Sequence, residues 1–164
     1  METSVGVLEL ERPGARGFVR GAFGTLLATG LAVGVRRLED LVAFRLAVEF
    51  KLEVYRLVRQ HPSVTHDLRY RSQLQDAASG IEANLAEGWR RYRSAELAQF
   101  ARYALASLEE ARRRLDDGVH RGHFPDAACT QARLLAGRCS WTLLAFVRAV
   151  QRLGKTPHSP KGPN

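Results

Sequence analysis

Apolar residues recur with the period of an α-helix through most of this chain. The clearest run lies between Leu97 and Leu115, where apolar residues are spaced three and four positions apart, so that they share one helix face. Ala, Leu, Arg and Glu, which are all good helix formers, dominate residues 38–153, whereas Gly and Pro gather at the two ends. The pattern therefore predicts an all-α fold.

Four helical segments are expected, and their bounds should hold to within about four residues. The first runs over about 39–60 and the second over about 65–88, with Gly88 at the C-cap position. Ser94 is a suitable N-cap for the third, which ends near Gly118 or Gly122, and the fourth covers about 126–153. Because the connections are short, consecutive helices should be antiparallel neighbours. We predict an antiparallel up-down four-helix bundle.

The two ends of the chain differ from this central region. Residues 1–37 are rich in Gly and contain an apolar run from Ala22 to Val35. This run is shorter than the roughly 20 residues that cross a bilayer, and no signal-peptide cleavage pattern follows it. We expect residues 1–37 to be a poorly ordered extension, residues 38–153 to be the bundle and residues 154–164 to be a flexible tail. A membrane or partner anchor in the first segment is the alternative.

The chain carries 25 basic and 17 acidic residues, for a formal net charge of +8. Residues 38–153 hold 18 Lys/Arg and 14 Asp/Glu, so that 18 − 14 = +4 lies in the predicted bundle and the other +4 lies in the flanks. Most of the cations are Arg, which can contact phosphate in bidentate fashion. The balance permits binding to nucleic acid or to an anionic membrane, and demonstrates neither.

Two cysteines, Cys129 and Cys139, lie ten residues apart in the fourth predicted helix. That spacing corresponds to about 15 Å of helical rise, which is beyond the reach of a disulfide. Cys139 is predicted to face the core and Cys129 to face away from it. A reducing, cytoplasmic setting is therefore favoured.

Two helices have more apolar surface than a monomeric bundle needs. More than half the circumference of the first helix is apolar, with Phe50 and Val54 on its flanks, so that this helix is either central or buried on two sides. In the fourth helix Trp141, Leu144 and Val147 fall outside the main apolar face. These five residues are the expected interface of a homo-oligomer.

Arginines alternate with aromatic residues in the segment Trp89–Arg93, between the second and third helices. Arginine can contact phosphate, and the rings can stack on unpaired bases. The alternative interpretation is a solvated turn in which Trp89 caps the core. In an up-down bundle this turn lies at the same end as the start of the first helix and the end of the fourth. We define the basic pole as the residues gathered there: Arg36, Arg37, Arg90, Arg91, Tyr92, Arg93, Arg152 and Lys155.

No combination of residues indicates catalysis. His120 and His123 have a spacing that could chelate a metal, but they flank Gly122 at a predicted helix end, where a solvated surface is the expected interpretation. The glycines lack the pattern of a phosphate-binding loop. We therefore expect a non-enzymatic protein with no metal and no cofactor.

The stretch Ser79–Gly88, which reads SGIEANLAEG, is the most distinctive in the chain. It resembles the S-I-x-x-N-I-A-E-G signature of a bacterial family known as four helix bundle proteins, first noticed in intervening sequences of large-subunit ribosomal RNA genes. The segments Leu38–Phe44 and Glu96–Glu110 also resemble the first and third helices of that family. The resemblance covers residues 38–153.

The resemblance implies a four-helix bundle that forms homopentamers. One relative, the accessory variability protein of diversity-generating retroelements, is a basic pentamer that works with a reverse transcriptase and nucleic acid. In the signature, Ser79, Asn84, Glu87 and Gly88 are the marked residues. Because a buried amide must be hydrogen-bonded, Asn84 and Ser79 are interpreted as fixing helix register or satisfying a loop end, with ligand binding as the alternative.

Two functional hypotheses follow. The first is a non-enzymatic oligomeric scaffold that binds nucleic acid, RNA foremost, through the basic pole with low sequence specificity. The second is a protein–protein interaction adaptor of the same fold without a nucleic-acid role. The candidate partners are further copies of the chain, with five as the number that the resemblance implies, nucleic acid and a reverse transcriptase, and no membrane association is expected.

Overall fold

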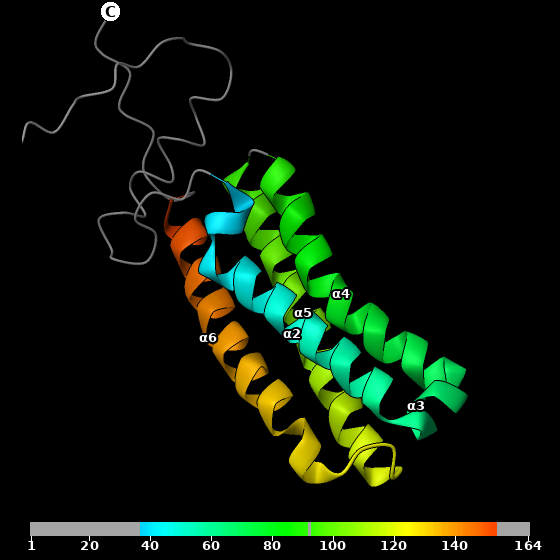
Figure 1. Ribbon diagram of the computed structural model, residues 1–164. Helices are drawn as coiled ribbons and strands as arrows, with labels where there is room; N and C mark the ends of the chain where they lie inside the picture. The colour runs from blue at the N-terminus through cyan, green and yellow to red at the C-terminus, as the bar shows by residue number, and fades with distance from the viewer. Residues whose placement is uncertain (1–36, 92, 154–164) are drawn as a thin grey trace, which may run out of the picture.

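The computed structural model describes residues 37–91 and 93–153, except for the side chain of Leu153. All regular secondary structure in these ranges is helical, which confirms the all-α prediction (Figure 1). The elements are η2 (Leu38–Asp40), α2 (Val42–Gln60), α3 (Pro62–His66), α4 (Leu68–Arg90), α5 (Ser94–His120), η3 (Asp126–Cys129) and α6 (Thr130–Leu153). The expectations for residues 1–36, Tyr92 and residues 154–164, with Arg36 and Lys155 among them, lie outside the described residues.

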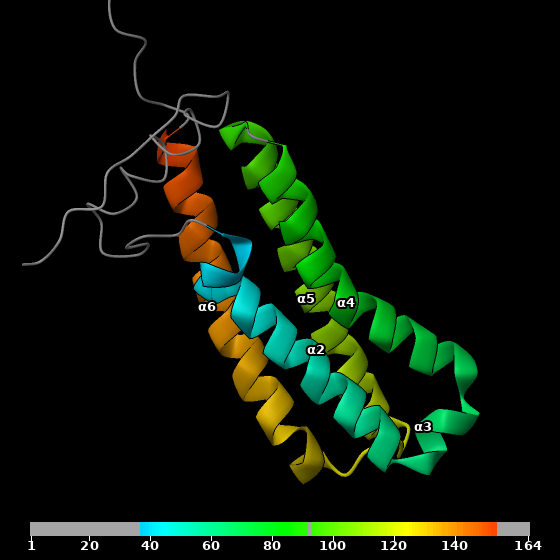
Figure 2. The same cartoon turned by 45° about the horizontal axis from the view of Figure 1, so that its top comes forward.

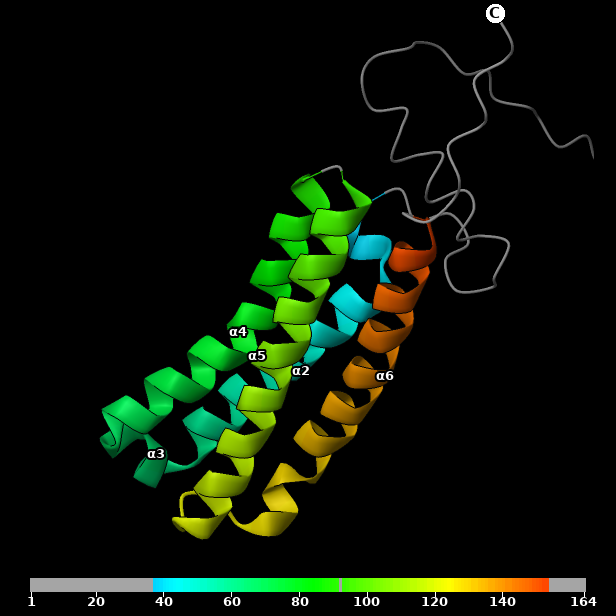
Figure 3. The same cartoon turned by 180° about the vertical axis from the view of Figure 1, so that it is seen from behind.

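The long helices α2, α4, α5 and α6 pack side by side, and each contacts two of the others. Helix α2 lies against α4 and α6, and α5 lies against the same two helices from the other side. Successive long helices run in opposite directions along the molecule, as the views from the front and from behind agree (Figures 1 and 3). None of the helices in the described ranges is long and apolar enough to cross a membrane.

The core lies along the centre of these four helices and holds no buried polar or charged residue among those described. The predicted stripe of the third helix is buried from Leu97 to Leu115 by way of Ala101, Ala104, Leu108 and Ala111, and only its member Phe100 is half-buried. Removing each large apolar side chain from water stabilises the fold by about 1.5–3 kcal/mol. The largest fully buried side chains include Phe50, Leu57, Leu74, Ile81, Leu85, Leu108, Leu115 and Leu143.

The second predicted helix is divided in two, which corrects the expectation of one helix over 65–88. Helix α3 ends at His66, and α4 begins at Leu68. Between them the Asp67 carboxylate accepts a hydrogen bond from the backbone N–H of Tyr70 at 3.0 Å. Asp67 is therefore the N-cap of α4, and it satisfies one of the N–H groups that have no partner within the helix.

Gly88 is not a C-cap, because α4 continues to Arg90. A Cβ atom at Gly88 would lie 2.6 Å from the Cβ of Phe100, so the missing side chain lets α5 approach α4 closely. The glycine with positive φ in the described ranges is Gly122, at 74°, two residues after the end of α5. The reversal of the chain after α5 is therefore made at Gly122.

Three of the residues expected at an oligomer interface belong to the core of the single chain. Phe50 and Val54 are both 0% exposed and Val147 is 7% exposed. Helix α2 is buried on two sides because α4 and α6 both pack on it, which was one of the two arrangements left open. Trp141 and Leu144, in contrast, are 69% and 43% exposed, as expected for an outer face.

Candidate nucleic-acid interface

One end of the molecule brings together the end of α4, the start of α5, the start of η2 and the end of α6 (Figure 1, upper end; Figure 2, top brought forward). Arg90 and Arg91 close α4, Arg93 precedes α5, and Arg152 lies in the last turn of α6. Arg37 precedes η2 at the same end. Five described residues of the basic pole thus come from separate parts of the chain to one end.

Three of these five arginines already have an acidic neighbour. Arg91 pairs with Glu87 at 2.6 Å. Arg93 lies 3.9 Å from Glu96, and Arg37 lies 3.5 Å from Asp40. Each pair joins residues three or four positions apart, and most of the side chains are more than a third exposed. Exposed pairs of this kind contribute little to stability, so that a phosphate can replace the carboxylate.

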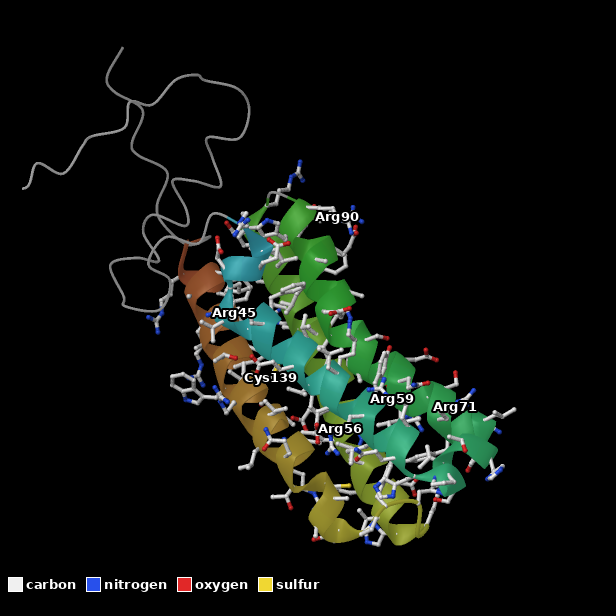
Figure 4. The ribbon with its side chains drawn as sticks, in the orientation of Figure 1. Arg45, Arg56, Arg59, Arg71, Arg90 and Cys139 are labelled. Carbon is white, nitrogen blue, oxygen red and sulfur yellow. The ribbon has the colours of Figure 1, made fainter. Side chains whose placement is uncertain are left out.

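Arg90 and Arg152 are exposed and form no ion pair with any described residue. The Nε of Arg90 donates to the Ala86 carbonyl at 3.4 Å, and the side chain projects from the end of α4 (Figure 4). This end also holds four acids, Glu39, Asp40, Glu87 and Glu96, so the net charge of its described residues is 5 − 4 = +1. The guanidinium groups of Arg90 and Arg152 are the cations of this end that are best placed to contact a phosphate.

A second basic surface, which the sequence interpretation missed, lies on the outside of α6. This helix holds four arginines and no acidic residue along its 24 positions. Arg133 pairs with Asp116 at 3.0 Å and Asp126 at 2.8 Å. Arg138 and Arg148 are exposed without an ion pair in the described ranges. The absence of acids from so long a segment is a signal that the sequence itself carries.

The signature residues lie mostly within α4 and against α5. The Asn84 side-chain amide donates to the Gly80 carbonyl at 2.7 Å and to Ser107 Oγ of α5 at 3.4 Å. Ser79 Oγ donates to the Asp76 carbonyl in its own helix, at 3.2 Å. The contact between Asn84 and Ser107 favours the role in helix register for Asn84, whereas Ser79 makes no such link.

The opposite end of the molecule is held by contacts between elements. Tyr70 Oη donates to the Arg114 carbonyl at 2.5 Å, and burial raises the pKa of this phenol well above its usual range. The hydrogen bond from the Tyr70 N–H lowers the pKa of Asp67. His123 Nε2 lies 3.3 Å from Asp67 Oδ2. That carboxylate partner was not foreseen, because 56 positions separate the two residues.

The two cysteines lie in the interior of the described structure. Both cysteines are free and buried, so the expectation that Cys129 faces away from the core is wrong. Burial raises the pKa of the Cys139 thiol to about 12 and also raises the pKa of Cys129, which keeps both thiols protonated and unreactive at neutral pH. In the described part of the chain, no cluster of three or more His, Cys, Asp or Glu residues could hold a metal ion.

Comparison with known proteins places this architecture in a family. No curated protein matches the chain. A family model described as 23S rRNA-intervening sequence protein matches residues 39–143, from just before α2 to the middle of α6, and so includes the signature in α4. The chain belongs to the family of 23S rRNA-intervening sequence proteins.

Proposed function

We propose that this protein is a non-enzymatic oligomeric scaffold, an antiparallel up-down four-helix bundle, that binds RNA through its basic pole. The observation that carries the proposal is the gathering of arginines from four parts of the chain at one end, where Arg90 and Arg152 form no ion pair with a described residue. Guanidinium groups bind phosphate oxygens in bidentate fashion. The connection of the family to ribosomal RNA intervening sequences makes RNA the first nucleic acid to test.

Low sequence specificity follows from where the charges lie. The arginines of the pole stand on helix ends and turns, and no helix is presented in the manner of a groove-reading motif. Phosphate contacts position a nucleic acid without reading its bases. The local carboxylates at Glu87 and Glu96 exchange for phosphate, so that affinity should depend steeply on salt.

Assembly is the second part of the proposal. Large apolar side chains are exposed on two different helices, Val42 and Leu52 on α2 and Leu134 and Leu144 on α6. Apolar residues on separate faces suit a head-to-tail contact, which closes into a ring when the rotation between successive copies completes a full turn. A ring of five, the number that the family resemblance implies, would place five poles around one axis. With two free thiols, the assembly suits the reducing cytoplasm.

The test is a triple variant in which Arg90, Arg91 and Arg93 are replaced by Ala. If about three phosphate contacts to a single strand are removed, the log–log dependence of affinity on salt should become shallower by about 2. Filter binding of several unrelated RNA sequences over a range of salt measures both affinity and slope. The variant should bind all of them more weakly.

The matched control replaces Arg59, Arg69 and Arg71, which form no ion pair with a described residue. Arg59 and Arg71 lie towards the other end of the molecule (Figure 4), and Arg69 lies beside Arg71 in the first turn of α4. The control variant removes the same charge and should retain more affinity than the pole variant. Equal affinity and equal slope for wild type and pole variant would exclude the pole as the binding site. Negligible binding by all three proteins at moderate salt would favour the adaptor hypothesis instead.

A further inference from the structure

Helix α6 differs from the other long helices in its charge. Helices α2, α4 and α5 each contain acidic residues, and Arg56, Arg112 and Arg114 pair with acids of their own helix. Helix α6 contains none, and its arginines at 138, 148 and 152 are exposed without an ion pair in the described ranges. An uncompensated row of guanidinium groups attracts an anionic partner.

These three arginines share one side of the helix with Trp141. At 100° per residue, Arg138, Trp141, Arg148 and Arg152 fall within about 80° of the helix circumference. They extend over 14 positions, or about 21 Å along the helix axis. Trp141 is 69% exposed, so its ring is available to a partner. We call these four residues the α6 strip.

Helix α2 adds a further cation beside the strip. The Sγ of Cys139 lies 4.0 Å from the carbonyl oxygen of Ala43, which sets the two helices at the same height at that point. Arg45, two positions further along α2, is exposed, forms no ion pair with a described residue and lies on the outside of α2 next to α6 (Figure 4). Glu49, one turn further along α2, is also exposed, so α2 contributes a cation and an acid near its junction with α6.

The chemistry of the strip suits one kind of occupant. A second copy docked symmetrically through the same face would bring three guanidinium groups of each chain, none paired with a described residue, against one another without an acid on either α6 to offset them. A head-to-tail neighbour on this face is the occupant that the sedimentation test below distinguishes. An exposed indole among guanidinium groups is instead the combination that holds single-stranded nucleic acid, in which rings stack on bases and cations track the backbone. Arg152 belongs both to the strip and to the basic pole, so the two surfaces are continuous.

We propose that a single-stranded nucleic acid runs from the basic pole along the outside of α6. Arg152, Arg148 and Arg138 contact successive parts of its backbone, and one base stacks on Trp141. The proposal rests on the proposed function and names the substrate class, because stacking on Trp141 requires an unpaired base. The length of the strip fits a site of a few nucleotides.

Variants of Trp141 distinguish the binding of single strands from the binding of duplexes. Replacing Trp141 with Leu keeps an apolar side chain and removes the aromatic face, and it should weaken binding of a 12-nucleotide oligouridine by about tenfold. Binding of a blunt RNA duplex of the same length should not change. Trp141→Phe should restore most of the affinity, and Tyr103→Leu, which removes another exposed ring on α5, is the matched control. Oligodeoxyuridine of the same length shows whether the site distinguishes RNA from DNA.

Fluorescence gives a direct readout. The difference in emission between wild type and Trp141→Phe isolates Trp141 from Trp89. Stacking predicts that the single strand quenches this difference in emission and that the duplex does not.

The arginines of the strip are tested by the dependence of affinity on salt. Replacing Arg138 and Arg148 with Gln should reduce the log–log salt slope for single strands by about 1.4. The control is Arg59→Gln with Arg71→Gln, at the other end of the bundle.

Sedimentation of each variant distinguishes a nucleic-acid face from a contact between copies. The proposal requires unchanged assembly of Trp141→Leu together with weaker single-strand binding. Altered assembly with unchanged binding would identify a protein interface and overturn the proposal. If Trp141→Leu and the Arg138/Arg148 double variant bind as wild type while the pole variant is weak, the strip is excluded and the pole function stands.

Discussion

Two glycines within long helices have opposite surroundings, although both adopt ordinary helical backbone. A Cβ atom at Gly88 would collide with Phe100 of α5, whereas a Cβ atom at Gly137 on α6 would meet nothing within 4 Å. Since Ala is the better helix former by up to about 1 kcal/mol, the sign of a Gly→Ala change depends on this space alone.

We predict that Gly88→Ala destabilises the protein by about 1–3 kcal/mol, because α4 and α5 must separate to admit the methyl group. Gly137→Ala, the matched control, should stabilise it by a few tenths of a kcal/mol to about 1 kcal/mol. Urea denaturation followed by circular dichroism measures both changes. Equal stability of the two variants would show that the close approach at Gly88 does not constrain the packing.

Single residues also show why the interface prediction was only partly right. Trp141 and Val147 both fall outside the apolar face that periodicity defines, yet one is 69% exposed and the other 7%. Periodicity gives the position of a residue on the helix circumference but not how many neighbours the helix has. Because both α2 and α5 pack on α6, the buried arc extends as far as Val147.

Helices α4 and α5 are joined by a polar contact as well as by apolar packing. The Asn84 amide reaches Ser107 Oγ at 3.4 Å, one turn from the place where Gly80 lies against the same serine. A polar contact inside an interface of small residues holds the helices at one axial position, because sliding by a turn would leave the amide without its partner across the interface. The signature in α4 therefore specifies how α5 docks.

A double-mutant cycle tests this link. Asn84→Ala and Ser107→Ala should each lower the free energy of unfolding, and their effects should couple by about 0.5–1.5 kcal/mol. Ser79 bonds only within α4, so a cycle of Ser79→Ala with Ser107→Ala is the control and should show no coupling. Additive effects of Asn84→Ala and Ser107→Ala would contradict a role in register.

At the scale of single elements, the sequence predicted where the long helices lie but not where they are interrupted. The four apolar patterns located the long helices because the period of 3.6 residues does not depend on tertiary contacts. The break at Asp67 was missed although its N-cap hydrogen bond to Tyr70 is local, whereas the contacts of Asp67 with His123 and Arg121 join residues more than 50 positions apart and could not be foreseen. Likewise Gly88 matches a C-cap by position, and only the approach of Phe100 reveals its actual role.

In the whole molecule, the short connections were enough to bring the arginines of the pole to one end. Which of them are free could not be foreseen, because ion pairs depend on rotamers as well as on position. The α6 strip does not follow from the apolar periodicity of α6, because it is defined by arginines on a helix without acidic residues.

Assembly is a property of the whole molecule. We predict that the purified full chain sediments as a discrete multimer at micromolar concentration, because Leu52 and Leu144 expose apolar surface on two different helices. Leu52→Glu and Leu144→Glu should each shift the population towards monomer, whereas Arg113→Glu, on α5, should not. A single species of 18.3 kDa for wild type would refute this prediction.

The ion pairs at the two ends of the molecule differ in the separation of their partners along the chain. At the pole each described pair, such as Arg91 with Glu87, lies within four residues of the same segment. At the opposite end, Arg133 joins α6 to α5 and η3, and Asp67 joins the start of α4 to Arg121 and His123 after α5. Arg133 and Asp67 at the far end thus hold separate elements together, and a change at either of them removes contacts between elements. Each described arginine of the pole can be substituted without breaking a contact between elements. Related proteins can therefore differ in what this end binds while they keep the same fold.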